Sequence, residues 1–365
     1  MKKSFPRQEN ELLIGNYILD AVISIIVEWN CSPSCIGSLP HSDPVKAVDF
    51  ILKHLNEIPS WPQLPVTGFR ENMYIQFSQN LPGIKIDEEN KRVSVNLLDY
   101  DPEEIYMKII SEDPDMFPLP AENFSGFYEF ISRELSGYKA IKGQVTGPIS
   151  LGLQMTDQDD KPAIYDPTYA EILRKNLQFT AMWQEKELKK KCGRTIIFID
   201  EPYLSIIGTP FASISPSDAV SWINEVVSGL EDMKGIHCCA NTDWPLVMSM
   251  NIDVLSFDAY DYGYTIALYP EEVSAFLERG GCLSWGIIPN NEETLKSTDC
   301  DSIISHFEKI VSDLESKGVD KDLLLKNSIL TPQCGLSGLS EEASEGAMDL
   351  LVNVSKVVQE KYSLG

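Results

Sequence analysis

The chain has 365 residues, of which 43% are hydrophobic and 23% are charged. This is the balance of an ordinary globular protein, and it argues against a disordered chain and against a membrane protein. Lys and Arg total 30 and Asp and Glu total 55, which gives a formal charge of −25. Nucleic-acid binding is therefore not expected, because an acidic surface repels phosphate groups.

The N-terminal segment shows neither a signal peptide nor a membrane span. The apolar core that a signal peptide needs is missing near Met1. The apolar stretch Tyr17–Trp29 is interrupted by Asp20 and Glu28, and it is shorter than the roughly 20 residues that span a bilayer. We expect this stretch to be a strand or helix packed on the core, within an N-terminal extension over residues 1–32, and we expect a cytoplasmic protein.

After residue 32, short apolar runs alternate with longer amphipathic stretches, which is typical of β-α units and a parallel sheet. Eight strands are predicted, over Ser34–Ser38, Gln63–Val66, Lys139–Val145, Thr195–Ile199, Gly235–Cys239, Asp253–Phe257, Cys282–Ile287 and Ser328–Thr331. Helices are predicted between and after them, over Asp43–Leu55, Arg70–Gln79, Pro167–Lys191, Ser217–Glu231, Pro270–Glu278, Asp301–Lys317 and Glu341–Lys361. This count favours an α/β fold, a single (β/α)₈ TIM barrel over residues 33–365.

One segment departs from the β-α alternation. Polar and apolar residues alternate over Leu81–Asn96, around a turn at Asp87–Asn90, and this pattern predicts an inserted β-hairpin. A Gly-x-Gly-x-x-Gly motif after the first strand is missing, so a dinucleotide-binding half is not supported.

Chemistry in a barrel is located where its strands end. His237 and Cys239 close one predicted strand, and Cys334 follows another. Residues two apart in a strand face the same side, so the imidazole and the thiol can meet at one point, whereas Cys238 faces away. One imidazole and two thiolates suit Zn²⁺ and leave a fourth coordination position open. The alternative is a strand-end histidine with ordinary buried cysteines. In a cytoplasmic chain of this size, the eight cysteines are not expected to form a disulfide framework.

Five strand-end motifs occur in a fixed order along the chain. They are Ile36-Gly37-Ser38-Leu39-Pro40, Thr146-Gly147-Pro148, Ile199-Asp200-Glu201-Pro202, His237-x-Cys239 and Thr331-Pro332-x-Cys334-Gly335. From about residue 33 to 360 the chain resembles the catalytic half of cobalamin-independent methionine synthase, within the superfamily that includes uroporphyrinogen decarboxylase. The resemblance implies a zinc site whose ligands are His237, Cys239, Cys334 and a carboxylate at Asp258, where the family more often has Glu.

The resemblance also implies how an amino-acid substrate binds. Asp200 corresponds to the carboxylate that holds the amino group of homocysteine, and the backbone of Ile36, Gly37 and Ser38 corresponds to the loop that receives its carboxylate. A second family carboxylate has Glu71 as its nearest counterpart. His41 follows the Gly-Ser loop, so Asp200 and His41 are the candidate catalytic residues.

Zinc deprotonates a bound thiol. A Cys₂His ligand set adds negative charge that keeps a sulfur nucleophile electron-rich, so it favours thiol alkylation over water activation. The leading hypothesis is therefore a zinc-dependent methyltransferase that converts homocysteine to methionine.

Two departures from the family pattern leave the methyl donor open. The chain contains no second N-terminal barrel, and Gln154 occupies the place of a tryptophan that stacks on folate. The donor is either methyltetrahydrofolate or a methylcorrinoid, free or carried on a protein, and Trp61 and Trp285 are aromatic residues that could line its site. Three alternatives remain. The first is a corrinoid-linked methyltransferase to another thiol such as coenzyme M. The second is a uroporphyrinogen decarboxylase-like enzyme, and the third is a non-catalytic zinc-binding protein.

Overall fold

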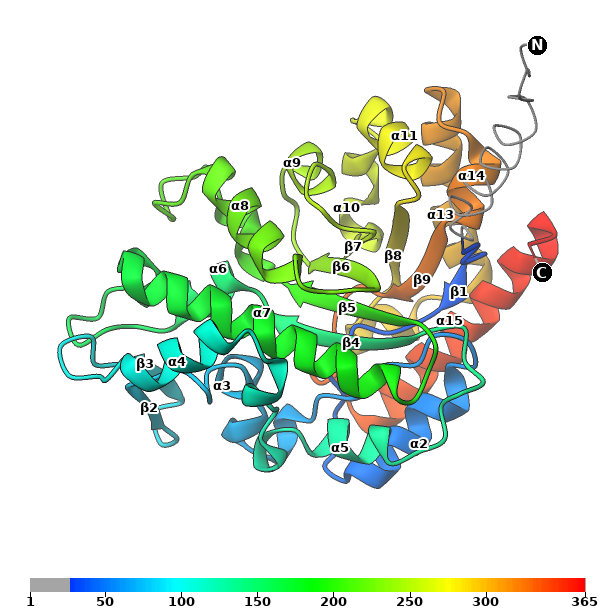
Figure 1. Ribbon diagram of the computed structural model, residues 1–365. Coiled ribbons are helices and arrows are strands. Elements are labelled where there is room, and N and C mark those ends of the chain that lie inside the picture. The colour runs from blue at the N-terminus through cyan, green and yellow to red at the C-terminus, as the bar shows by residue number, and fades with distance from the viewer. Residues whose placement is uncertain (1–26, 365) are drawn as a thin grey trace, which may run out of the picture.

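The computed structural model describes residues 27–364, and a curled parallel sheet forms its centre (Figure 1). Seven strands lie in the order β1-β9-β8-β7-β6-β5-β4. Their bounds are β1 Ser32–Pro33, β4 Ile141–Thr146, β5 Thr195–Asp200, β6 Met233–Cys238, β7 Val254–Asp258, β8 Cys282–Ile288 and β9 Ser328–Pro332. The strands are buried on both faces, apart from the first two residues of β6, because helices cover the outside and side chains fill the inside of the curl.

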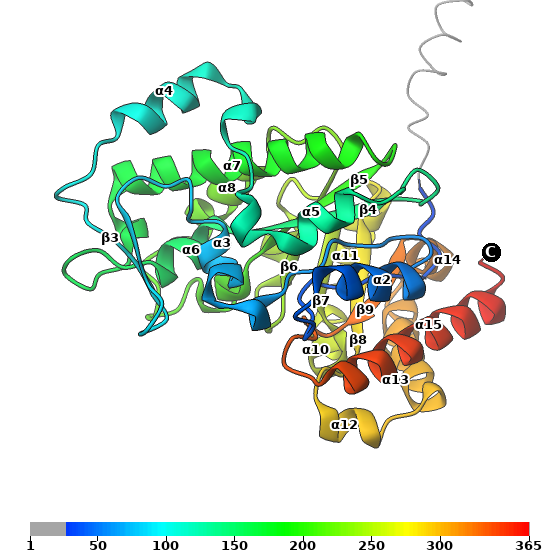
Figure 2. The same cartoon turned by 90° about the horizontal axis from the view of Figure 1, so that it is seen from below.

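Helices surround this sheet and connect its strands (Figures 1 and 2). They are α2 Pro44–His54, α3 Met73–Gln76, α4 Glu103–Ser111, α5 Ser125–Ile131, α6 Pro148–Gln154, α7 Pro167–Lys189, α8 Pro216–Val227, α9 Trp244–Met248, α10 Ala259–Ile266, α11 Pro270–Glu278, α12 Glu292–Lys296, α13 Cys300–Ser316, α14 Lys321–Lys326 and α15 Glu341–Tyr362. None of the helices within residues 27–364 is long and apolar enough to cross a membrane.

The sheet does not close into a barrel as a continuous ladder. Between β1 and β4, the chain forms two isolated parallel bridges, one from Ser60 to Lys142 of β4 and one from Gln63 to Ser38. The expected (β/α)₈ barrel is thus observed as a seven-stranded curled sheet, consistent with a TIM-like barrel, in which an extended segment occupies the place of the eighth strand.

The side chain of Gln184 explains why the hydrogen-bonded ladder is interrupted between β1 and β4. Gln184 of α7 accepts a hydrogen bond from the backbone N–H of Gln144 at 2.9 Å and donates one to its carbonyl at 3.0 Å. The same amide oxygen accepts the Trp61 indole N–H at 2.9 Å. The polar backbone groups of Gln144 are therefore satisfied by α7 instead of by a neighbouring strand.

Two predicted elements are wrong. The strand over Gln63–Val66 is replaced by a 3₁₀ turn at Pro65–Thr67, because the pairing residues lie earlier and proline cannot donate to a ladder. The helix over Arg70–Gln79 is reduced to a 3₁₀ turn and the short α3. It is broken at Asn72, whose backbone is extended and whose side chain accepts the N–H of Tyr74 at 3.0 Å.

The other predicted elements agree better with the structure. The hairpin is confirmed as β2 Ile84–Asp87 and β3 Arg92–Val95, which pair antiparallel. Six of the eight strands and the six helices other than Arg70–Gln79 are confirmed within a few residues. The first strand is displaced from the predicted range Ser34–Ser38, because the laddered residues Ser32–Pro33 precede that range and only an isolated bridge forms within it, at Ser38. The stretch Tyr17–Trp29 lies almost entirely outside the described residues, and only its end is placed, with Trp29 buried in the core.

We predict that Gln184→Leu destabilises the protein by at least about 2 kcal/mol, since it leaves the N–H and C=O of Gln144 and the Trp61 indole buried without partners. Urea unfolding measures the change. Gln178→Leu on the same helix, where the side chain is only half-buried, is the control and should change the free energy of unfolding by less than about 1 kcal/mol. Equal effects of the two variants would contradict the role given to Gln184.

Candidate functional site

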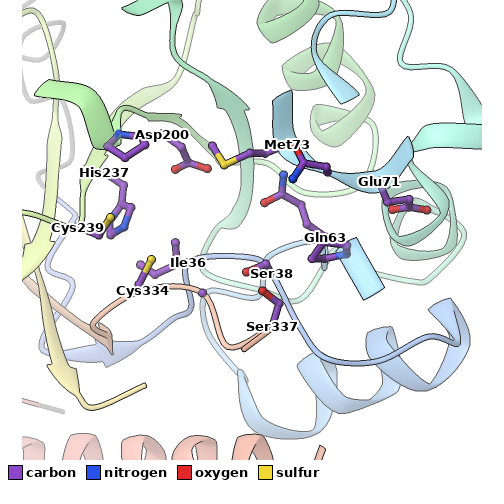
Figure 3. Close-up of a pocket in the computed structure, with 14 residues that line it drawn as sticks. Ile36, Ser38, Gln63, Glu71, Met73, Asp200, His237, Cys239, Cys334 and Ser337 are labelled. Atoms are coloured by element: carbon purple, nitrogen blue, oxygen red, sulfur yellow. The ribbon is translucent and has the colours of Figure 1, made fainter. Parts of the chain in front are cut away.

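A pocket of about 230 Å³ opens at the carboxyl ends of the strands (Figure 3). Its lining comes from segments far apart in the sequence and includes most of the predicted site residues. The lining residues are Ile36, Ser38, Gln63, Pro65, Glu71, Asn72, Met73, Asp200, Pro202, His237, Cys239, Cys334, Gly335 and Ser337.

His237 near the end of β6 is placed by the parallel register. Its neighbour in β5 is Asp200, and its neighbour in β7 is Ser256. The Nδ1 atom of His237 lies 2.9 Å from the Ser256 hydroxyl oxygen, whereas its buried Nε2 atom has no hydrogen-bond partner within residues 27–364. With Nδ1 donating to Ser256, Nε2 keeps a free lone pair, which is the arrangement of a metal-ligating histidine.

Cys239 and Cys334 meet the His237 ring from two different strand ends. The ligand atoms of these three residues all lie within 4.8 Å of one another. Cys334 is held by tight packing of the next residue, since a Cβ added to Gly335 would lie 1.9 Å from the Ser38 hydroxyl. The N–H of Leu336 also donates to the Ser38 carbonyl at 2.8 Å. The predicted grouping of His237, Cys239 and Cys334 is therefore present in the fold.

The two thiols influence each other's protonation. The Cys334 thiol and the His237 imidazole beside it lower the pKa of Cys239 to about 4. The adjacent Cys239 thiolate and burial raise the pKa of Cys334 well above its usual value. Without metal the pair therefore holds one proton between two sulfurs. One thiolate, one displaceable proton and an unpartnered Nε2 fit a Zn²⁺ ion bound by three protein ligands.

Asp200 ends β5 beside this group. Only 6% of its surface is exposed, and its Oδ1 atom has no hydrogen-bond partner. Burial raises the pKa of Asp200 to about 6, although the nearby Lys142 cation opposes that shift. Lys142 itself donates to the Ile36 carbonyl at 2.5 Å. An unpaired, buried carboxylate oxygen is suited to a cationic ligand, because such a group otherwise costs stability.

Glu201, the next residue, faces away from the pocket. Its carboxylate accepts the backbone N–H groups of Ile149 at 2.8 Å and Ser150 at 2.9 Å, and also the Ser150 hydroxyl at 2.6 Å. It thus caps the N-terminus of α6, where a negative charge is favourable. A Cβ on Gly147 would lie 2.2 Å from this carboxylate, which explains the glycine of the Thr146-Gly147-Pro148 motif.

Asp258 is not part of the cysteine-histidine group. Its carboxylate caps α10, where it accepts the N–H of Asp261 at 2.9 Å, and it accepts the Gln333 side-chain amide at 3.1 and 3.2 Å. The group of potential ligands contains only His237, Cys239 and Cys334 at this site, among the residues that the structure describes. The expectation that Asp258 is a ligand therefore finds no geometric support, since its oxygens already serve the helix and Gln333.

Glu71 and His41 lie farther from the cysteines. Glu71 lines the opposite end of the pocket, as Figure 3 shows, and its carboxylate accepts the backbone N–H of Ser125 at 3.1 Å. Burial raises the pKa of Glu71. His41 is buried against Phe50, with ring centroids 4.8 Å apart, and it does not line the pocket. The structure therefore separates His41 from the group to which the sequence assigned it.

The loop at Ile36–Ser38 shows why glycine stands at position 37. Gly37 has a φ of +144°, and a Cβ there would lie 2.7 Å from the Gln144 amide nitrogen. Glycine is the residue that tolerates both conditions. Ile36 and Ser38 on either side line the pocket, so the backbone of this loop borders the cavity.

Several other positions are clarified by the structure. Cys238 is fully buried with its thiol 3.4 Å from the Ala240 carbonyl, which confirms that it faces away from the site. Trp61 and Trp285 are fully buried in the core and line none of the site. Gln154 accepts the Tyr203 hydroxyl at 2.9 Å outside the pocket. Sequence reasoning missed five lining residues, Gln63, Pro65, Asn72, Met73 and Ser337.

No protein-family model and no curated protein sequence matches this chain. Solved structures do match. A B12-independent methionine synthase from Shewanella sp. W3-18-1, solved with selenomethionine, has 15% identity and a TM-score of 0.56, over 91% of this chain and 98% of that one. A putative vitamin-B12-independent methionine synthase from Listeria monocytogenes has 15% identity and a TM-score of 0.56, over 90% and 98%.

A methyltransferase from Methanosarcina mazei is also similar, with 16% identity and a TM-score of 0.51 over 86% of each chain. At these identities the likeness shows a shared fold. It extends over nearly the whole length of the two synthase chains.

We predict that Cys239 of the metal-free protein reacts with iodoacetamide almost equally fast at pH 6 and pH 8. Its pKa of about 4 makes it a thiolate at both values, whereas the raised pKa of Cys300 makes that thiol react roughly 100-fold faster at pH 8. Peptide mass spectrometry after chelation and timed alkylation measures both rates in one sample. A Cys239 rate that rises in parallel with that of Cys300 would contradict the lowered pKa.

Proposed function

We propose that the protein is a zinc-dependent methyltransferase that transfers a methyl group to a thiol, and that homocysteine is the acceptor, giving methionine. One observation carries this proposal. The unpartnered Nε2 of His237 lies beside two cysteine sulfurs, in the same pocket as an unpaired, buried carboxylate oxygen of Asp200. The site thus combines a soft metal-binding group with a binding point for an ammonium group.

His237, Cys239 and Cys334 would hold the zinc ion. When bound there, zinc supplies a Lewis acid that keeps the substrate thiol deprotonated at neutral pH. Ser256 orients the His237 ring through its contact with Nδ1. Three protein ligands would leave a fourth coordination position for a substrate thiol, which is the requirement for a catalytic site as opposed to a structural one.

The rest of the pocket binds the amino-acid end of the substrate in this proposal. The Asp200 carboxylate accepts the substrate ammonium, and the backbone around Ile36, Gly37 and Ser38 receives the substrate carboxylate. Glu71 at the far end of the pocket supplies further negative charge for the rim. Strand ends therefore hold the thiol in one place, which orients its sulfur toward an incoming methyl group.

The structure offers observations that discriminate among the alternative acceptors. Coenzyme M lacks an amino group, so it would leave the buried Asp200 carboxylate without a partner. A uroporphyrinogen-type substrate carries several carboxylates, and among the residues that the structure describes, no Arg or Lys lines this pocket. Both facts favour homocysteine. The donor is tested directly, with methyltetrahydrofolate and methylcobalamin as the two candidates.

We predict that the full-length protein binds zinc through two sulfurs and gains a third sulfur ligand when homocysteine is added. X-ray absorption at the zinc edge, on protein prepared under reducing conditions, measures the sulfur count with and without the thiol. Zinc whose ligands do not change on adding homocysteine would contradict the proposal.

Cys239→Ser and Cys334→Ser should lose the zinc of this site and all methyl transfer while the fold is retained. Cys300→Ser, at a half-buried position at the start of α13, is the matched control and should keep both. Asp258→Asn should also keep the zinc, because that carboxylate serves α10 and Gln333. Circular dichroism confirms folding of each variant.

We predict that Asp200→Asn raises the KM for homocysteine by on the order of 10- to 100-fold, with zinc retained, since a charged hydrogen bond to the ammonium is lost. In the wild type, kcat/KM should fall as the pH drops through about 6, because the raised pKa of Asp200 means that its carboxylate is protonated below that pH. Asp159→Asn on an exposed loop is the control. An Asp200→Asn enzyme with unchanged KM and an unchanged pH profile would overturn the homocysteine assignment.

A further inference from the structure

We propose a second divalent-cation site, separate from the pocket, where α2 meets α15. Its ligands are His54, Glu345 and Asp349, whose ligand atoms all lie within 4.8 Å of one another. Figure 2 shows the two helices side by side, one from near the start of the described chain and one from its end. The inference does not depend on the methyl-transfer proposal, since it uses none of the same residues.

His54 is the strongest part of this evidence. It is the last residue of α2 and is only 5% exposed. Its Nδ1 atom lies 2.8 Å from the carbonyl oxygen of Phe50. A carbonyl oxygen can only accept, so Nδ1 carries the proton and donates it. In the neutral ring, Nε2 then holds a lone pair, and this buried atom has no hydrogen-bond partner.

Two carboxylates lie close to the Nε2 atom of His54. The distance from His54 Nε2 to Asp349 Oδ1 is 3.3 Å, and the distance to Glu345 Oε1 is 3.6 Å. Two ligands at about 2.0–2.1 Å from a tetrahedral cation are separated by roughly 3.3–3.4 Å. The spacing therefore matches atoms that share one cation.

The placement of Glu345 and Asp349 in α15 also favours a positive charge between them. Glu345 and Asp349 are four residues apart and lie on one face of the helix, where like charges repel each other. The Lys53 ammonium pairs with Glu345 and offsets part of this repulsion. Lys53 is 61% exposed, so its ammonium can swing into solvent and leave that carboxylate to a cation. One imidazole nitrogen and two carboxylate oxygens suit Zn²⁺.

A cation here would brace the two loops that form the pocket. The chain enters α2 directly after the Ile36–Ser38 loop, and it enters α15 directly after the Cys334 loop. The two loops already contact each other through the hydrogen bond from Leu336 to Ser38. A shared ion between α2 and α15 would therefore hold together the first and last segments of the fold, close to the site but outside it.

The experiment counts zinc ions on full-length protein. Apo protein is prepared by chelation and titrated with Zn²⁺ in competition with a chromophoric chelator. The wild type should bind two ions, and Asp349→Asn and His54→Gln should each bind one, or bind the second at least about tenfold more weakly. Asp349 and Glu345 are exposed enough that Asp349→Asn and Glu345→Gln keep the fold. Glu342→Gln, an exposed residue of the same helix, is the control and should bind two.

The Cys239→Ser/Cys334→Ser double variant separates the two sites. It should keep one zinc ion, and adding Asp349→Asn should remove that ion. Co²⁺ substitution adds a spectroscopic readout, since sulfur-to-cobalt absorption should persist in Asp349→Asn and vanish in the double variant. An equal zinc count in the wild type and Asp349→Asn would overturn this second site. If the cysteine site alone fails, the wild type should bind one ion, the double variant should bind one and Asp349→Asn should bind none, so the ion lost on changing Asp349 still reports the second site.

Discussion

The parallel register of three central strands is the constraint on which the site depends. It places Asp200, His237 and Ser256 at the same level of β5, β6 and β7. One neighbour of the histidine therefore orients its ring, and the other presents a carboxylate to the same cavity. A shift of one residue in any of these strands would turn its side chain to the opposite face of the sheet. The curl of the sheet then brings Cys334 from β9 to meet them.

The site carries polar atoms that the fold itself does not satisfy. The Nε2 atom of His237 and the Oδ1 atom of Asp200 are buried without hydrogen-bond partners. Such atoms destabilise a folded protein unless a ligand completes them, and they are uncommon in protein interiors. By contrast, the neighbouring carboxylates of Glu201 and Asp258 are saturated by helix N-termini. This contrast distinguishes the side chains that are available to bind a ligand from those that cap helices of the fold.

Much of this arrangement is visible in the sequence. Apolar runs and helix caps locate most strands and helices, and the two-residue spacing of His237 and Cys239 places both on one side of a strand end. Cys334 joins them only through the fold, and the family resemblance was the signal that linked it. The capping role of Asp258 was missed because the sequence does not distinguish a carboxylate that caps a helix from one that binds a metal. The interruption of the sheet was also missed, because it depends on the Gln184 side chain, which is 123 residues from Trp61 in the segment between β1 and β4.

The pairing of β1 with β9 has a consequence for the order in which the protein is assembled. Ser32 pairs with Ile329, so the first strand finds its neighbour only after nearly the whole chain has been synthesised. Until then, the early β-α units must remain associated through their local contacts, and the backbone groups of β1 have no neighbouring strand. Cys334 follows that same last strand. The thiol pair therefore comes together at the end of folding, and a nascent chain that stalls before β9 lacks the second sulfur together with Gly335 and Ser337 of the pocket lining.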